Sequence, residues 1–140
     1  MNILLAVDGS PYTQKMLDYL AHNNEMLGPE HRYTAITVQP ALPPRARAAL
    51  SKEVIDSYYA EEAEKVMTPV VQYMQKKGVE LHTLSRIGPA GDTIAQAAEE
   101  GGYDLLVMGT HGHGSLGKLV MGSVSTQVLA KCSVPVLLVR

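Results

Sequence analysis

Residues 105–115 read Leu105-Leu106-Val107-Met108-Gly109-Thr110-His111-Gly112-His113-Gly114-Ser115, so a short apolar run leads directly into a segment dense in glycine. Consecutive apolar residues bounded by a turn signal are typical of a strand that is buried on both faces of a parallel sheet. A helical spacing follows at residues 123–131. A buried strand, a glycine-rich loop and a helix in this order predict an α/β fold.

Apolar runs and helical spacings alternate along the rest of the chain in the same way. Strand-like runs lie at residues 2–7, 33–38, 79–86 and 134–139, and helical spacings lie at residues 11–27, 48–77 and 91–101. Strands that alternate with helices form a parallel sheet with helices on both faces. We therefore predict a single domain, residues 1–140, built on a five-stranded, doubly wound α/β sheet.

Proline and its neighbours set the expected boundaries of these elements. Ser10 is a candidate N-cap because the proline after it fits the first helical position. Pro69 lies inside the predicted helix 48–77 and is expected either to kink it or to break it after Thr68, because proline removes a helical hydrogen bond. Residues 39–47 are rich in proline and are expected to form a mobile surface loop.

The composition bounds what the protein can bind. With 46% hydrophobic and 19% charged residues the chain matches ordinary globular proteins, and its net charge of -2 gives no attraction to nucleic acid. No segment reaches the roughly 18 apolar residues that a membrane span needs, and no signal peptide is recognisable. We therefore expect a cytoplasmic protein without membrane or nucleic-acid partners. The single cysteine, Cys132, is expected to pack in the core.

The glycine-rich segment has the properties of a phosphate site. Glycine lets a ligand approach the backbone closely, and the amides at the start of the following helix offer partial positive charge. A P-loop interpretation of residues 112–118 is disfavoured because Leu119 stands where a magnesium-binding hydroxyl belongs. A dinucleotide interpretation is disfavoured too, because the next strand closes with Val139 and Arg140 rather than with an acidic residue.

A third spacing, Gly109-x2-Gly112-x9-Gly122-Ser123, resembles the nucleotide signature of the ATP-binding branch of the universal stress protein family. The segment Ala6-Val7-Asp8-Gly9-Ser10 is similar to the opening of that family, and Ser133-Val134-Pro135-Val136-Leu137-Leu138-Val139-Arg140 is similar to its closing strand. The resemblance therefore covers nearly the whole chain. It implies the adenine nucleotide alpha hydrolase-like form of the doubly wound fold.

The resemblance implies a site for ATP, with Mg²⁺ held mainly by the phosphates. The matching positions place the ribose hydroxyls at Asp8, the adenine edge at the backbone of Val38, and the phosphates at the glycines and the start of the last helix. The implied nucleotide-binding residues are Ala6, Asp8, Val38, Met108, Gly109, Gly112, His113, Gly114, Ser115, Gly122, Ser123 and Val124. The alternatives are that Asp8 only makes the turn into the first helix and that Ser123 is only an N-cap.

Two histidines lie in the glycine-rich loop. His113 stands where many relatives carry a basic residue, so its charge depends on pH. His111 and His113 also have the spacing of a metal pair, but no third ligand is near them in the sequence. A solvated pair of loop histidines is the preferred interpretation, and no metal bound by the protein itself is expected.

Three functions are compatible with these features. The first is a nucleotide-dependent stress or signalling protein that binds ATP without efficient catalysis. The second is a weak ATPase or phosphotransferase, which would need an acid or base and several cations beside the γ-phosphate; His111, His113 and Lys118 are the groups nearby. The third is a dimerising scaffold with an empty pocket. The intact glycine spacing favours the first.

The last strand predicts a homodimer. Pro135 cannot donate a ladder hydrogen bond, so residues 134–139 are expected at an edge of the sheet. The apolar residues of this run carry no charge that would keep another strand away, and they are Val134, Val136, Leu137, Leu138 and Val139. Pairing with a second copy about a two-fold axis would satisfy this edge, and the family resemblance implies the same interface.

Overall fold

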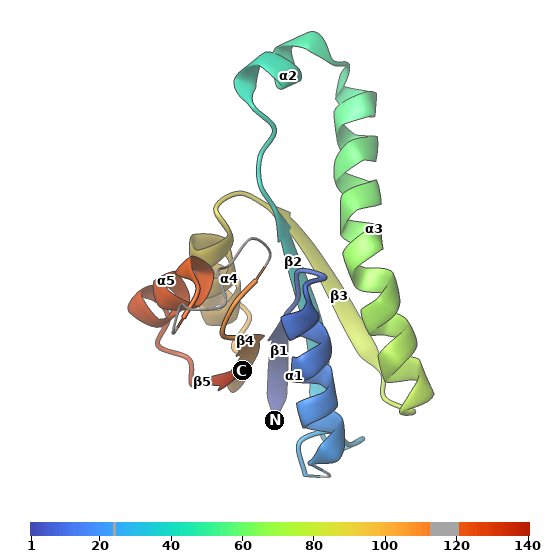
Figure 1. Cartoon of the computed structure of the whole chain (residues 1–140), viewed down its shortest axis with the longest axis vertical. Coiled ribbons are helices and arrows are strands. Elements are labelled where there is room, and N and C mark those ends of the chain that lie inside the picture. The colour runs from blue at the N-terminus through green and yellow to red at the C-terminus, as the bar shows by residue number, and fades with distance from the viewer. Residues whose placement is uncertain (24, 113–120) are drawn as a thin grey trace.

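The computed structural model describes residues 1–23, 25–112 and 121–140. Within these residues, five parallel strands form one sheet in the order β3-β2-β1-β4-β5 (Figure 1). The strands are β1 Asn2–Ala6, β2 Arg32–Gln39, β3 Leu81–Ile87, β4 Leu105–Gly109 and β5 Val136–Val139. The helices are α1 Pro11–His22, α2 Pro44–Ala49, α3 Lys52–Lys76, α4 Ala90–Glu100 and α5 Ser123–Lys131. The predicted fold class is confirmed.

Buried side chains of β1, β2 and β4 point into one of two cores because the faces of a strand alternate. On one face, Leu5 is fully buried against Met16 of α1 and Val70 of α3. On the other face, Leu4 is fully buried with Ile94 of α4 and Val128 of α5. The helices therefore cover the sheet in two layers. Burying one such side chain contributes about 1.5–3 kcal/mol, so both cores are needed to hold the sheet.

The order of the strands reverses at β1. The chain places β2 and then β3 on one side of β1, and it returns to place β4 and β5 on the other side. The connections at the carboxyl ends of β1 and β4 consequently lead to helices on opposite faces. This arrangement opens a crevice between the two strand ends, which is where ligands bind in sheets of this kind.

The first helix is shorter than its sequence pattern predicts. It ends at His22 rather than at residue 27, because Asn23 takes an extended conformation and its side-chain amide donates to the carbonyl of Tyr19. The residues that follow are held differently. The hydroxyl of Tyr33 donates to the carbonyl of Met26 at 2.6 Å and accepts from the amide of Gly28 at 3.0 Å. A tertiary contact thus replaces the last predicted turn.

The predicted helix 48–77 and the predicted loop 39–47 are both revised by the structure. Residues 44–49 form the short helix α2, and a separate helix α3 begins after Ser51, whose hydroxyl accepts from the amide of Val54 at 3.3 Å. Helix α3 continues through Pro69, so the break expected after Thr68 does not occur. Buried side chains on both sides of the proline, such as Met67 and Val70, hold the helix against the sheet.

Residues 40–61 project beyond the carboxyl ends of the strands, and we call them the arm (Figure 1). The arm comprises the connection after β2, the helix α2 and the first part of α3. Buried residues of α3 begin only at Ala63. The amide of Leu42 donates to the hydroxyl of Tyr59 at 2.8 Å, which joins the two limbs of the arm near its base.

The predictions for Cys132 and for the N-cap Ser10 can be compared with the structure. Cys132 is half-buried and packs against the core on the α4 and α5 face, as expected. Ser10 precedes α1 as predicted, but its hydroxyl makes no capping bond and is buried without a hydrogen-bond partner. In the described part of the chain, no helix combines the length and apolar character that crossing a membrane requires.

Candidate functional site

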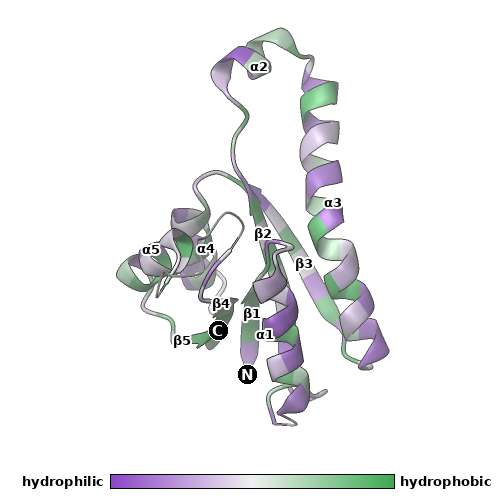
Figure 2. Cartoon of the chain, viewed as in Figure 1, coloured by the Kyte–Doolittle hydropathy of each residue, from purple (hydrophilic) through white to green (hydrophobic). Residues whose placement is uncertain are grey.

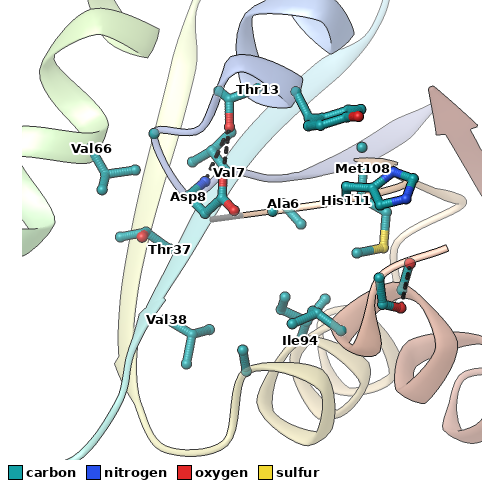
Figure 3. A pocket seen from close by; sticks show the side chains of 18 of the residues that line it. Ala6, Val7, Asp8, Thr13, Thr37, Val38, Val66, Ile94, Met108 and His111 are labelled. Atoms are coloured by element: carbon teal, nitrogen blue, oxygen red, sulfur yellow. Dashed lines mark hydrogen bonds between the residues drawn. The ribbon is translucent and has the colours of Figure 1, made fainter. Parts of the chain in front are cut away.

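A cavity of about 810 Å³ opens at the carboxyl ends of β1, β2 and β4, where the strand order reverses (Figure 3). Its walls come from these strand ends, from the starts of α4 and α5, and from the middle of α3. Cavities of several hundred cubic ångströms are typical of sites for small molecules and cofactors.

The predicted site residues that the structure describes all line this cavity. They are Ala6, Asp8, Val38, Met108, Gly109, Gly112, Gly122, Ser123 and Val124. His113, Gly114 and Ser115 lie outside the described residues. Residues that are up to 118 positions apart in the sequence (124 minus 6) are therefore gathered around one space.

Asp8 follows β1 and is oriented by the start of α1. Its Oδ1 accepts from the amide of Ser10 at 2.9 Å and from the hydroxyl of Thr13 at 3.1 Å, while Gly9 turns the chain with a φ of 78°. The turn interpretation of Asp8 is therefore correct. Asp8 also lines the cavity, so its place in the turn is compatible with a ligand role.

The other oxygen of Asp8 lies against the glycine-rich segment. A Cβ atom added to Gly112 would stand 2.4 Å from Asp8 Oδ2, which is shorter than any real contact. Only glycine at position 112 therefore lets the carboxylate keep this place while its Oδ1 remains in the turn. The sequence suggested that Gly112 gives access to a phosphate, and the structure adds that it gives room to Asp8.

The start of α5 is joined closely to the segment after β4. The amide of Gly122 donates to the carbonyl of Thr110 at 2.7 Å, and the buried hydroxyl of Ser125 donates to the same carbonyl at 2.8 Å. A Cβ on Gly122 would lie 3.3 Å from this carbonyl oxygen and 3.3 Å from the Cα of His111. The N-cap of α5 is Gly122, so the interpretation of Ser123 as the N-cap is wrong. Ser123 is the first helical residue, and the first amides of a helix have no partner within it.

His111, one of the two histidines of the predicted solvated pair, is half-buried and contacts its neighbours. Its ring lies 5.0 Å from the ring of Tyr12, measured between centroids, and its Nδ1 is 2.9 Å from the hydroxyl of Thr110. Tyr12 in turn packs over Gly109, where an added Cβ would meet Tyr12 Cβ at 2.7 Å. The described residues contain no cluster of three potential metal ligands.

One wall of the cavity is apolar. Ala6, Val38, Ile94 and Met108 approach the same space from β1, β2, α4 and β4 (Figure 3). All four belong to the core on the α4 and α5 face or pack against it. A flat, weakly polar ring can bury its faces here, while polar groups at the edge of the cavity remain available to orient it.

The sequence analysis missed the wall supplied by α3. Glu62, Lys65 and Val66 line the cavity, and Lys65 Nζ lies 3.0 Å from Glu62 Oε1. The hydrogen bond and charge of Glu62 raise the pKa of Lys65. An acidic and a basic residue three positions apart are usual on any solvated helix face, so the spacing itself gave no sign of a site. Only the packing of α3 beside β2 brings this pair to the mouth of the cavity.

The chain is similar to curated universal stress proteins. It is 34% identical over 138 residues to the universal stress protein Slr1230 of Synechocystis, covering 99% of this chain and 42% of that protein. It is 32% identical over 143 residues to the universal stress protein A homolog 1 of Coxiella burnetii, covering 95% of this chain and 92% of that protein. The matches to Slr1230 and to two proteins of Methanocaldococcus jannaschii cover 42%, 53% and 49% of those proteins, so the chain spans about half their length.

Solved structures share the fold. The M. jannaschii protein MJ0577 superposes with a TM-score of 0.81 at 24% identity, covering 99% of this chain and 94% of that one. A universal stress protein family protein of Arabidopsis thaliana with AMP bound gives a TM-score of 0.72 at 16% identity, covering 99% and 90%. The universal stress protein of Archaeoglobus fulgidus in complex with dAMP gives 0.69 at 22% identity, covering 100% and 98%.

Membership of a protein family is shown by a family model that matches the whole chain. The model of the Universal stress protein family matches residues 1–140. The five-stranded α/β fold agrees with the solved structures of universal stress proteins that superpose on the chain. The chain belongs to the universal stress protein family.

Proposed function

We propose that the protein binds ATP in this cavity, with Mg²⁺ held mainly by the phosphates, and that it acts in the cytoplasm as a nucleotide-dependent stress or signalling protein. The observation that carries the proposal is the arrangement of three features around one space: an apolar wall, an oriented carboxylate, and a helix start flanked by glycines. Family relatives with AMP or dAMP bound support an adenine nucleotide.

Different residues of the cavity suit different parts of the nucleotide. The apolar wall around Val38 and Met108 suits the adenine ring, and the carboxylate of Asp8 suits the ribose hydroxyls, which are donors. The phosphates suit the start of α5 beside Gly112 and Gly122, where unpartnered amides and the helix dipole favour negative charge. A side chain at Gly112 would displace Asp8, and one at Gly122 would displace the backbone of residues 110–112, which borders the same space.

The described residues offer little for efficient phosphoryl transfer. Rapid transfer needs a positioned base and several cations around the γ-phosphate. Of the carboxylates that line the cavity, Asp8 uses Oδ1 in the turn and Glu62 is bonded to Lys65. Weak hydrolysis assisted by His111 is the alternative function, because this ring lines the cavity near the start of α5.

Release of bound small molecules tests the proposal directly. Freshly purified protein, denatured and analysed by mass spectrometry, is expected to release an adenine nucleotide, and the emptied protein is expected to bind ATP in the presence of Mg²⁺ by calorimetry. Incubation with ATP is expected to give hydrolysis that is far slower than one turnover per second, the lower end of usual enzyme rates. If the protein releases no nucleotide and does not bind ATP, the result would favour the dimerising scaffold with an empty pocket.

We also propose that two copies pair through β5. This strand lies at the edge of the sheet, and the amides of Leu106 and Thr110 donate hydrogen bonds to the carbonyls of Pro135 and Val139. In a parallel pair, the backbone groups of the intervening residues point the other way, so Val136 and Leu138 direct theirs outward. Val139 is buried within its own chain, so the interface would rest on the outward backbone more than on that side chain.

Val136→Pro is expected to weaken this dimer. Proline removes the outward amide but leaves the ladder to β4, so a two-fold pair would lose two hydrogen bonds of about 1 kcal/mol each, or about thirtyfold in affinity. Val136→Thr keeps the amide and the branched shape and serves as the control. Sedimentation over a dilution series measures both variants. A proline variant that is folded and as dimeric as the threonine variant would exclude β5 pairing.

A further inference from the structure

Four buried side chains with hydroxyl groups line the cavity, and three of them are already engaged in hydrogen bonds. The four are Thr13, Thr37, Thr110 and Ser125. Thr13 donates to Asp8 Oδ1 at 3.1 Å. The hydroxyl of Thr110 lies 2.9 Å from Nδ1 of His111, and that of Ser125 donates to the carbonyl of Thr110 at 2.8 Å. In the described part of the chain, the hydroxyl of Thr37 makes no hydrogen bond.

Thr37 stands in the sheet where an apolar side chain would pack equally well. The alternation of β2 puts it on the same face as Tyr33 and Ala35, which are fully buried in the core under α1 and α3. Figure 2 shows hydrophobic residues along β1, the next strand. A buried hydroxyl without a hydrogen bond is unfavourable, so such groups normally bind the protein, water or a ligand.

The hydroxyl of Thr37 is open to the cavity although the residue is only 2% exposed. The unpartnered hydroxyl of Ser10 is sealed within the protein, and that of Thr37 is not. Figure 3 shows Thr37 among the side chains around the cavity, on the side of Val66 and Asp8. The charged pair on that side, Glu62 and Lys65, is bonded to itself at 3.0 Å. Thr37 therefore offers an uncommitted polar group to a ligand.

Thr37 and Asp8 lie close together on the same face of the sheet. Extending the β1–β2 register by one residue places Thr37 opposite Val7, whose amide donates to the carbonyl of Ile36 at 2.9 Å. Asp8 is the next residue, and neighbouring strands are about 4.8 Å apart. The carboxylate of Asp8 is turned to α1 by its bond to Thr13, and α1 covers the face on which Thr37 lies. One small ligand group can therefore contact both side chains.

In the proposed function, the parts of ATP follow the order of the strands. The adenine lies at Val38 at the end of β2, the ribose at Asp8 after β1, and the phosphates at the start of α5 beside β4. The 2′-hydroxyl of a nucleotide is next to the carbon that carries the base, whereas the 3′-hydroxyl is next to the carbon that leads to the phosphates. The 2′-hydroxyl is therefore the one on the β2 side of the ribose, where the hydroxyl of Thr37 opens.

We propose that Thr37 binds the 2′-hydroxyl of the nucleotide and makes the site selective for ribonucleotides over 2′-deoxyribonucleotides. The inference rests on the proposed function and deepens it. A hydroxyl both donates and accepts, so the two hydroxyls can bond in either direction while Asp8 accepts from the ribose. A 2′-deoxynucleotide would cover the hydroxyl of Thr37 and leave it unpaired. A site that hydrogen-bonds a ligand hydroxyl discriminates against the analogue that lacks it for this reason.

Calorimetric titration with ATP, 2′-deoxy-ATP and 3′-deoxy-ATP, each with Mg²⁺, tests the inference. The wild type is expected to bind ATP at least about tenfold more tightly than 2′-deoxy-ATP. Thr37→Val keeps the branched shape without the hydroxyl, and it is expected to reduce this ratio at least about fivefold, mainly through weaker binding of ATP. The ratio between ATP and 3′-deoxy-ATP is expected to stay the same, because Asp8 is unchanged.

Two further variants separate the hydroxyl from the packing of the strand. Thr37→Ser keeps the hydroxyl and is expected to retain the selectivity. Thr34→Val is the matched control and should change neither ratio, because Thr34 is a buried threonine of β2 that points to the opposite face and does not line the cavity. Thermal unfolding checks that each variant is folded.

The outcomes distinguish this inference from the proposed function. A wild type that binds ATP and 2′-deoxy-ATP equally, or a folded Thr37→Val protein with the ratio of the wild type, would overturn the role of Thr37 and leave ATP binding in place. The comparison within the wild type does not depend on any variant. A wild type that binds none of the three nucleotides would overturn the proposed function as well.

Discussion

Replacing Gly122 by valine is expected to lower ATP affinity about a hundredfold, which corresponds to losing two charge-assisted hydrogen bonds of about 1.5 kcal/mol each. Gly122 is buried where α5 starts, and its amide already bonds the carbonyl of Thr110. Even a single added Cβ would lie 3.3 Å from that carbonyl. The branched side chain of valine would push the segment 110–112 away from α5 and close the space for phosphate.

Calorimetry of ATP binding measures the effect, and thermal unfolding without nucleotide measures what the change costs the fold. Ala130→Val is the matched control, because it adds the same branched side chain to an exposed position of α5, and it should leave affinity unchanged. Gly122→Ala is expected to give an intermediate loss, since a shift of a few tenths of an ångström relieves its contacts. A folded valine variant with wild-type affinity would show that the phosphates bind elsewhere.

Asp8→Asn is expected to weaken ATP about ten- to a hundredfold while hardly changing the affinity for 2′,3′-dideoxy-ATP. An asparagine oxygen can still accept from the amide of Ser10 and the hydroxyl of Thr13, so the turn into α1 is kept. The amide group then replaces the oxygen on the side of Gly112 and cannot accept from ribose hydroxyls. Losing a charge-assisted hydrogen bond costs about 1.5–3 kcal/mol.

The comparison of the two nucleotides isolates the ribose contact. Thr13→Val is a useful control, because it removes a bond to Asp8 Oδ1 without touching the charge, and it should lower both affinities to a similar, smaller extent. Parallel titrations of both ligands by calorimetry give the ratio. If Asp8→Asn weakens both nucleotides equally, Asp8 serves only the turn.

The sequence alone was sufficient for the sheet because its signals are local. Runs such as residues 3–7 and 105–108 are continuous and apolar, and continuity is what burial on both faces demands. The edge position of the last strand was also predictable, since Pro135 cannot donate to a ladder. The cavity residues at strand ends followed from the same reasoning, because parallel strands bring their carboxyl ends to one side.

Other features depend on contacts between distant residues and could not be predicted. The path of the chain after α1 depends on Tyr33 of β2, whose hydroxyl bonds residues 26 and 28. The α3 wall of the cavity depends on how a helix lies across β2, and no local pattern in Glu62 or Lys65 reports it. The break between α2 and α3 at Leu50 could not be predicted, because the alanines near Leu50 have a high helix propensity.

The position of Pro69 has a consequence for how α3 comes apart. Proline has no amide hydrogen, so the carbonyl of Lys65 lacks the helical bond it would receive four residues later. This gap falls inside the packed part of the helix, which begins at Ala63 and includes Met67 before the proline, and the exposed turns of the arm precede it. One backbone hydrogen bond fewer joins the two parts of the helix at this gap. The exposed turns before it can therefore unwind while the packed turns after it stay protected. One continuous helix thus contains two cooperative units, and the free energy of opening the arm is set by its own turns rather than by the global stability of the fold.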